Sequence, residues 1–93
     1  AYFKRVDLDM RDSKKFVNNN KDALLKALSS LGPNPRPITI DGVKVVFSDN
    51  SWILIRGSGT EPKLRIYSEA LSPGRVEELI NNAVSIVNQL RSN

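Results

Sequence analysis

The chain has 93 residues, of which 40% are hydrophobic and 26% charged, with a formal net charge of +4 and neither cysteine nor histidine. This length supports one hydrophobic core, so we expect a single domain over residues 1–93. The composition excludes disulfides, thiol chemistry and ordinary zinc sites, and with no span or signal peptide evident we expect a soluble cytoplasmic protein without a membrane partner.

The first two predicted elements are an edge strand and a helix. Residues 2–9 alternate loosely between apolar and charged side chains, which predicts a strand. Residues 12 and 13, an aspartate and a serine, can each cap a helix whose apolar positions recur at intervals of three and four up to Leu31. The asparagine run at 18–20 lowers helix propensity without interrupting this period, so we predict one helix. A glycine and three prolines at 32–37 then form a stiff connection inside the domain.

The middle of the chain predicts an antiparallel meander. Residues 38–40 and 43–47 read as strands joined by Asp41-Gly42, a pair favoured in two-residue hairpins. Two more strands are predicted at 52–55 and 63–69, and the second of these alternates between apolar and polar side chains.

The last element is a helix that begins at Ser72-Pro73, where a capping residue is followed by proline in the first turn. Its apolar positions keep a helical spacing as far as Leu90. The order of elements predicts an α+β fold, with an antiparallel sheet of four to five strands and two helices packed on one face.

The connection between the last two predicted strands, Arg56–Pro62, is the strongest functional signal. Gly57 and Gly59 are expected to let backbone N–H groups turn inward as an anion-binding nest. Ser58 and Thr60 add hydroxyl donors to the same short segment. We interpret this connection as a phosphate cradle, and the alternative is a plain glycine-containing hairpin loop.

Charged residues and a proline complete the prediction for this loop. Arg56 supplies a planar fork of N–H groups that matches two phosphate oxygens. Pro62 pushes Glu61 into an extended conformation, so the loop continues as a strand, unlike a P-loop or a Rossmann turn. We predict that Glu61 braces the loop by pairing with Arg65 or with another domain, and we place Glu61, Lys63 and Arg65 in a second tier. The predicted substrate phosphate-binding residues are Arg56, Gly57, Ser58, Gly59 and Thr60.

Residues 56–70, Arg-Gly-Ser-Gly-Thr-Glu-Pro-Lys-Leu-Arg-Ile-Tyr-Ser-Glu-Ala, closely resemble the phosphate-binding loop and following strand in the C-terminal domain of the α-D-phosphohexomutases. That family comprises phosphomannomutases, phosphoglucomutases and phosphoglucosamine mutases, and its members often carry proline where this chain has Gly57. The resemblance implies that Arg56, Ser58, Gly59 and Thr60 contact the phosphate of a hexose phosphate. It also implies a fold similar to one half of the TATA-box-binding protein.

The same resemblance implies that the chain is the C-terminal domain of a larger enzyme. Such enzymes move phosphate between C1 and C6 of a sugar through a phosphoserine and a bisphosphorylated intermediate, with Mg²⁺ bound outside this domain. The serine, magnesium and sugar-discriminating loops of the family are missing here, so we expect no catalytic residue, no metal site and no activity in the chain alone. The expected partners are a hexose phosphate and the other domains of the parent enzyme, without nucleic acid.

Two other classes of function stay open from composition. The positive charge and a basic antiparallel sheet also suit a small nucleic-acid-binding module, although the aromatic signature for base stacking is absent. A protein-interaction domain that uses an exposed strand edge is the third possibility. Trp52 could stack on a sugar ring, but we interpret it as a core or half-buried strand residue.

Overall fold

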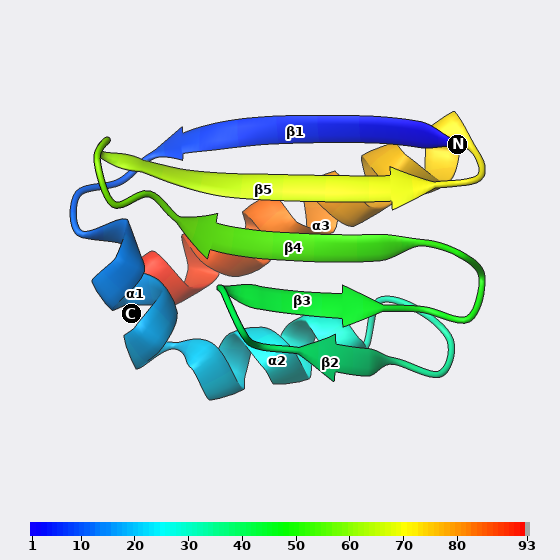
Figure 1. The fold of residues 1–93 in the computed structure, drawn as a ribbon, viewed down its shortest axis with the longest axis horizontal. Coiled ribbons are helices and arrows are strands. Elements are labelled where there is room, and N and C mark those ends of the chain that lie inside the picture. Colours follow the sequence, from blue (N-terminus) through cyan, green and yellow to red (C-terminus); the bar gives the residue numbers. More distant parts are fainter. Residues whose placement is uncertain (93) are drawn as a thin grey trace.

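The computed structural model describes residues 1–92 of the chain. Five strands form one antiparallel sheet in the order β1-β5-β4-β3-β2, and three helices cover one face of it (Figure 1). The strands are β1 (Tyr2–Asp9), β2 (Arg36–Ile38), β3 (Val43–Val46), β4 (Trp52–Gly57) and β5 (Lys63–Ala70), and the helices are α1 (Ser13–Asn19), α2 (Lys21–Ser29) and α3 (Pro73–Arg91). The predicted α+β class is confirmed.

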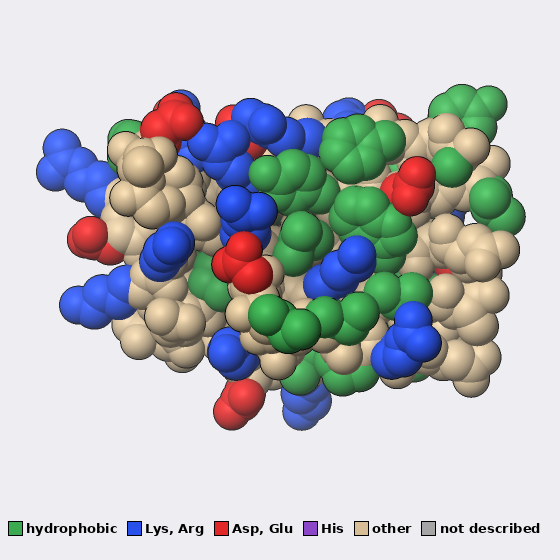
Figure 2. Space-filling model, in the orientation of Figure 1, with side chains coloured by type: hydrophobic (Ala, Val, Ile, Leu, Met, Phe, Trp, Pro, Cys, Tyr) green, Lys and Arg blue, Asp and Glu red, His purple; other side chains and the backbone are tan. Residues whose placement is uncertain are grey.

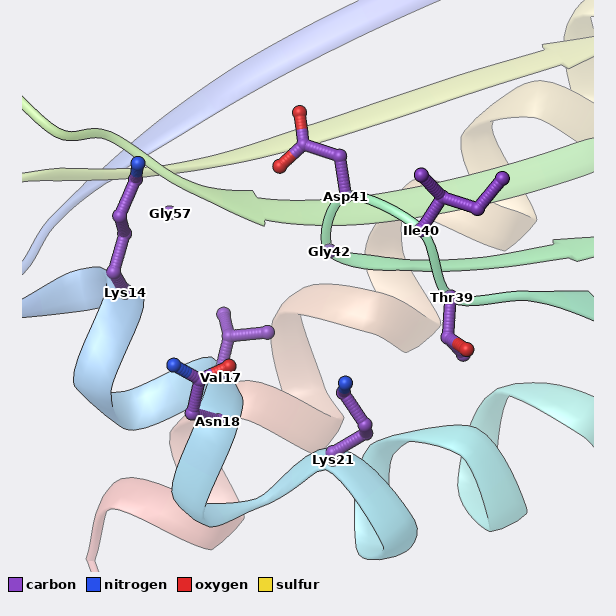
Figure 3. Close-up of a pocket in the computed structure, with 9 residues that line it drawn as sticks. All are labelled: Lys14, Val17, Asn18, Lys21, Thr39, Ile40, Asp41, Gly42 and Gly57. Atoms are coloured by element: carbon purple, nitrogen blue, oxygen red, sulfur yellow. The ribbon is translucent and has the colours of Figure 1, made fainter.

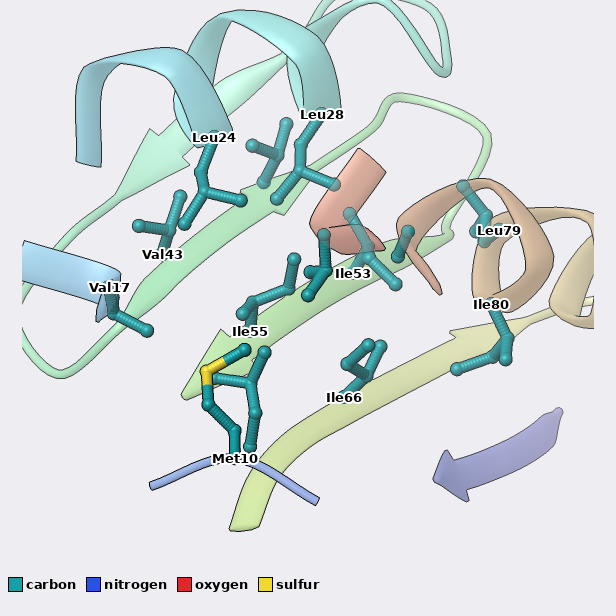
Figure 4. Packing of buried hydrophobic residues seen from close by; sticks show 14 of the residues in the cluster. Met10, Val17, Leu24, Leu28, Val43, Ile53, Ile55, Ile66, Leu79 and Ile80 are labelled. Atoms are coloured by element: carbon teal, nitrogen blue, oxygen red, sulfur yellow. The ribbon is translucent and has the colours of Figure 1, made fainter. Parts of the chain in front are cut away.

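The hydrophobic core lies between the sheet and the helices, as the alternation along the strands predicts (Figure 4). Ile53 and Ile55 of β4 and Leu64 and Ile66 of β5 are completely buried against the helices. Leu24 and Leu28 of α2 and Leu79, Ala83 and Val87 of α3 supply the opposing layer. Each fully buried aliphatic side chain contributes about 1.5–3 kcal/mol, and this burial holds the sheet in place.

Within residues 1–92, no helix covers the opposite face of the sheet, called the open face below (Figure 1). Phe3, Trp52 and Tyr67 lie on it, and the Phe3 ring centroid is 6.3 Å from the centroids of both other rings. The Lys44 ammonium lies 4.4 Å from the Trp52 ring centroid. Figure 2 shows hydrophobic side chains gathered near the middle of this face, with lysine and arginine side chains around them. Trp52 is therefore a half-buried strand residue, as interpreted from the sequence.

The first predicted helix is divided at Asn20, so the prediction of one helix was wrong. The Asn20 backbone adopts φ −115° and ψ 17°, and its side-chain Nδ2 donates to the carbonyl oxygen of Phe16 at 2.8 Å. The Asn20 backbone N–H donates to the same carbonyl oxygen at 3.0 Å, so the side chain adds a second donor at the last carbonyl group that α1 bonds in this way. Asp12 occupies the predicted cap position of α1 in a left-handed conformation, but its side chain makes no capping hydrogen bond.

The connection between β2 and β3 also differs from the prediction. Strand β2 ends at Ile38, which pairs with Lys44, so residues 39–42 form a longer connection than a two-residue hairpin. Ile40 is 95% exposed in this connection, because it lies beyond the last pair of the ladder. Gly42 has a φ of 82°, which favours glycine, and a Cβ there would lie 2.5 Å from the carbonyl oxygen of Ile55.

The end of β4 differs from the prediction, whereas the start of α3 agrees with it. Arg56 and Gly57 belong to strand β4 and not to the loop that follows it. The predicted start of α3 is confirmed: Pro73 is its first residue, and the Ser72 hydroxyl accepts the Arg75 N–H at 3.2 Å. No helix within residues 1–92 is long and apolar enough to cross a membrane.

Candidate anion-binding site

Both ends of the loop between β4 and β5 are hydrogen-bonded to residues 10–13, which lead into α1. The Ser58 N–H donates to the Ser13 hydroxyl at 2.9 Å, although the two residues are 45 positions apart. Ser13 is buried, with 1% of its surface exposed. At the other end of the loop, the Met10 N–H donates to the carbonyl oxygen of Pro62 at 2.9 Å. The start of α1 therefore sets the position of the loop.

Inside the loop, the Ser58 side chain organises the backbone. Its Oγ accepts the N–H groups of Thr60 at 3.3 Å and of Glu61 at 3.0 Å. None of the hydrogen bonds within residues 1–92 uses the N–H of Gly59, which lies at the exposed tip. The tip thus presents one backbone donor beside the Ser58 hydroxyl, whose own hydrogen can be donated outward.

The anion-binding nest predicted at Gly57 and Gly59 stays a prediction, and neither glycine uses a positive φ. Among the described residues, Gly42 is the glycine with a positive φ. Gly57 instead allows a close approach of α1, because a Cβ there would lie 2.5 Å from the backbone nitrogen of Lys14. The need for glycine at position 57 is steric and comes from tertiary packing.

Arg56 lies on the open face of the sheet and is the second-to-last residue of β4, next to the loop. Its side chain is 48% exposed, and its Nε lies 3.4 Å from Oδ2 of Asp41 in the connection between β2 and β3. The register places Arg56 directly opposite Arg65 of β5. Such an exposed ion pair contributes little energy, so an anion can compete with Asp41 for Arg56.

The second-tier residues form ion pairs of their own. Nη2 of Arg65 donates to Oε1 of Glu61 at 2.7 Å, so the predicted Glu61–Arg65 pair is present. Lys63 bonds to Asp9 of β1, and this hydrogen bond raises the pKa of Lys63 and lowers the pKa of Asp9. Lys63 is therefore turned toward β1, and its predicted second-tier role at the loop stays a prediction.

Basic residues at the start of α1, which the sequence did not connect with the loop, form the facing wall of a groove. The groove has a volume of about 500 Å³ and brings the loop opposite three cations. It is lined by Arg11, Asp12, Ser13, Lys14, Lys15, Ser58, Gly59, Thr60, Glu61 and Pro62. The only sign of this wall in the sequence was the Lys14-Lys15 pair, and two adjacent lysines by themselves indicate a solvent-exposed helix surface.

A second hollow of about 150 Å³ lies on the other side of Lys14, between α1 and the connection that contains Asp41 (Figure 3). Figure 3 shows the Lys14 side chain beside Gly57, with Lys21 at the opposite end of the hollow. Lys14 lines both the groove and this hollow. It is the side chain shared by the two concave surfaces.

No group of three or more His, Cys, Asp or Glu side chains able to hold a metal occurs within residues 1–92. The family resemblance implies that Mg²⁺ is bound outside this domain. The donors present, namely backbone N–H, hydroxyl, ammonium and guanidinium groups, are those that bind an oxyanion.

Residues 6–85 match the sequence model of a family described as "Phosphoglucomutase/phosphomannomutase, C-terminal domain". A probable phosphoglucosamine mutase of Methanocella arvoryzae is 42% identical over 79 residues, which cover 83% of this chain and 18% of the relative. A phosphoglucosamine mutase of Methanococcus vannielii is 37% identical over 84 residues, covering 87% of this chain and 19% of the relative. A phosphopentomutase of Thermococcus kodakarensis is 47% identical over 53 residues, covering 57% of this chain and 12% of the relative. In each case the match spans less than a fifth of the relative's length.

Proposed function

The chain belongs to the family of phosphoglucomutase and phosphomannomutase C-terminal domains, and from that membership we propose that it is the C-terminal domain of a larger phosphohexomutase. In this proposal it holds the phosphate of a hexose phosphate that does not react, while phosphoryl transfer between C1 and C6 occurs elsewhere through a phosphoserine. The parent enzyme is proposed to be cytoplasmic, and the chain, without cysteine, gives no reason to expect an oxidising compartment.

The observation that carries the proposal is the arrangement of donors around the loop tip. The Gly59 N–H and the Ser58 hydroxyl lie on the loop, and Arg56 stands at its entry. These groups recognise the charge and the tetrahedral shape of a phosphate, and in this proposal they make no contact with the sugar ring. A site of this kind can accept either phosphate of a bisphosphorylated sugar as the molecule reorients. By fixing the distant phosphate, it also positions the reacting oxygen and so contributes to rate.

The chemistry itself is assigned to other parts of the parent enzyme. We propose that the isolated chain has no mutase activity, since the family's serine loop is missing from its sequence. A phosphopentomutase is among the relatives that share this segment, which supports the proposal that the sugar is chosen elsewhere in the parent enzyme. Measured turnover by the purified chain, free of contaminating enzyme, would contradict this assignment.

The direct test is a titration of the isotope-labelled chain with inorganic phosphate and with a hexose phosphate, followed by amide shifts in NMR spectra. We expect saturable shifts that include residues 56–60, at millimolar ligand, because this segment supplies the backbone donors. A short RNA is the control: a nucleic-acid module would show larger shifts on the open sheet face, with an affinity that falls steeply with salt. No saturable phosphate shift in the loop would reject the proposal.

Removing the carboxylate that competes for Arg56 should strengthen phosphate binding. We expect Asp41→Asn to lower the phosphate Kd by about two- to fivefold, because an exposed ion pair contributes about 0.2–1 kcal/mol. Asp22→Asn, in the first turn of α2, removes the same charge away from the loop and serves as the control. Equal effects of the two substitutions would mean that net charge, and not the Arg56–Asp41 pair, governs the affinity.

A further inference from the structure

We infer that Lys14, at the start of α1, is a further phosphate-binding residue of this loop and contacts the anion from the side opposite Arg56. The inference rests on the proposed function and adds a ligand that comes from a different part of the chain. It assigns the groove between α1 and the loop to a phosphate group carried by a small molecule.

The first support is the distance between Lys14 and the loop tip. A Cβ built on Gly59 would lie 3.2 Å from Nζ and 3.4 Å from Cε of Lys14, so the ammonium group lies directly over this glycine. Gly59 is also the loop residue whose N–H is used by no hydrogen bond within residues 1–92. An oxyanion that accepts the Gly59 N–H therefore lies within reach of the Lys14 ammonium, and two donors converge on one group.

The second support is that the backbone of Lys14 is held in place. The position where a Gly57 Cβ would stand is 2.5 Å from the nitrogen and 2.7 Å from the Cα of Lys14, so strand and helix are in close contact there. The neighbouring residue Ser13 is buried and bonds to the N–H of Ser58. The fold thus fixes the position of the Lys14 backbone relative to the loop. Only the flexible side chain of Lys14 has to be ordered when an anion binds.

The third support is that Lys14 has no carboxylate partner among the ion pairs within residues 1–92. Arg56 and Arg65 do have one, since Arg56 lies beside Asp41 and Arg65 binds Glu61. Arg11 and Lys15 of the groove form no ion pair within residues 1–92 either, but Lys14 is the cation whose ammonium lies over Gly59. Asp12 and Glu61 also line the groove, but neither bonds to Lys14. When phosphate binds at the loop tip, Lys14 therefore gains an anionic partner and does not have to break an existing ion pair.

The test compares single substitutions in the same chain, with inorganic phosphate as the probe and amide shifts as the readout. Lys14→Gln is expected to raise the phosphate Kd about five- to tenfold, as for loss of one exposed charge-assisted hydrogen bond. Lys14→Arg should restore most of the affinity, because it keeps the charge and the donors. Lys26→Gln, at the exposed end of α2, removes the same charge far from the loop and should change the Kd less than twofold.

The outcomes separate this inference from the proposed function. If the unmodified chain binds phosphate but Lys14→Gln and Lys26→Gln weaken binding equally, the Lys14 inference is rejected and the proposed function stands. If the unmodified chain shows no saturable phosphate shift, the proposed function itself fails. Unchanged spectra of Lys14→Gln without phosphate, outside α1 and the loop, would exclude a general loss of structure as the cause of weaker binding.

Discussion

Replacing Arg56 with alanine is expected to weaken phosphate binding by about ten- to a hundredfold. Because the guanidinium fork is half exposed, its two hydrogen bonds are expected to contribute about 1.4–2.8 kcal/mol together, less than the sum of two fully charge-assisted bonds, and 1.4 kcal/mol is one decade of affinity. Part of this gain is offset, since phosphate must displace the contact between Arg56 Nε and Asp41 at 3.4 Å. The phosphate Kd of the chain measures the effect, and in the proposed parent enzyme it should appear as an equal fall in kcat/KM.

Arg36 provides the matched control for Arg56. It is an exposed arginine of β2 on the same sheet, and it forms no ion pair within residues 1–92. Arg36→Ala removes the same charge and the same side chain, so any general effect of net charge on phosphate binding appears in both variants. Equal losses of affinity in the two variants, or an unchanged affinity in Arg56→Ala, would contradict the role assigned to Arg56.

The second large effect is expected at Gly57. Gly57→Ala should destabilise the chain by about 1–3 kcal/mol, because the new Cβ would lie 2.5 Å from the backbone nitrogen of Lys14 and α1 would have to move away. This is a considerable part of the roughly 5–10 kcal/mol that holds a domain of this size together. The midpoint of urea unfolding, at constant slope, measures the change.

Two other glycines serve as controls for this steric argument. A Cβ on Gly74, in the first turn of α3, meets nothing within 4 Å, so Gly74→Ala should stabilise the chain by up to about 1 kcal/mol. At Gly59 the nearest atom is the flexible end of Lys14 at 3.2 Å, so Gly59→Ala should change stability little. If Gly57→Ala were as stable as Gly59→Ala, the close contact between β4 and α1 would not be what requires glycine at position 57.

The local elements could be predicted from the sequence because their signals are carried by neighbouring residues. Strand β1 has the predicted bounds, since alternation over eight residues is a signal of period two. The start of α3 follows from Ser72 and Pro73, whose capping and fixed φ act within one turn. The motif behind the proposed phosphate-binding role was visible for the same reason, as its hydroxyls, glycines and arginine are consecutive in the chain.

Where local signals competed with one another, the predictions were wrong. The apolar period continues through Asn20, yet α1 ends before that residue, whose side chain binds the Phe16 carbonyl group. The Asp41-Gly42 pair favours a tight turn, but β2 ends earlier, at Ile38, and the turn widens. In both places the local pattern was compatible with more than one structure.

The chain's sequence by itself therefore determined the α+β class, the order of its elements and the chemical character of the loop, because periodicity, caps and turn residues act over a few positions. Only the tertiary structure decided which residues meet at that loop. Ser13 and Lys14 reach it across 45 positions of sequence, and Gly57 is required by the helix that packs on it. Such contacts depend on how the sheet and helices pack, and no local pattern of residues encodes the distance between them.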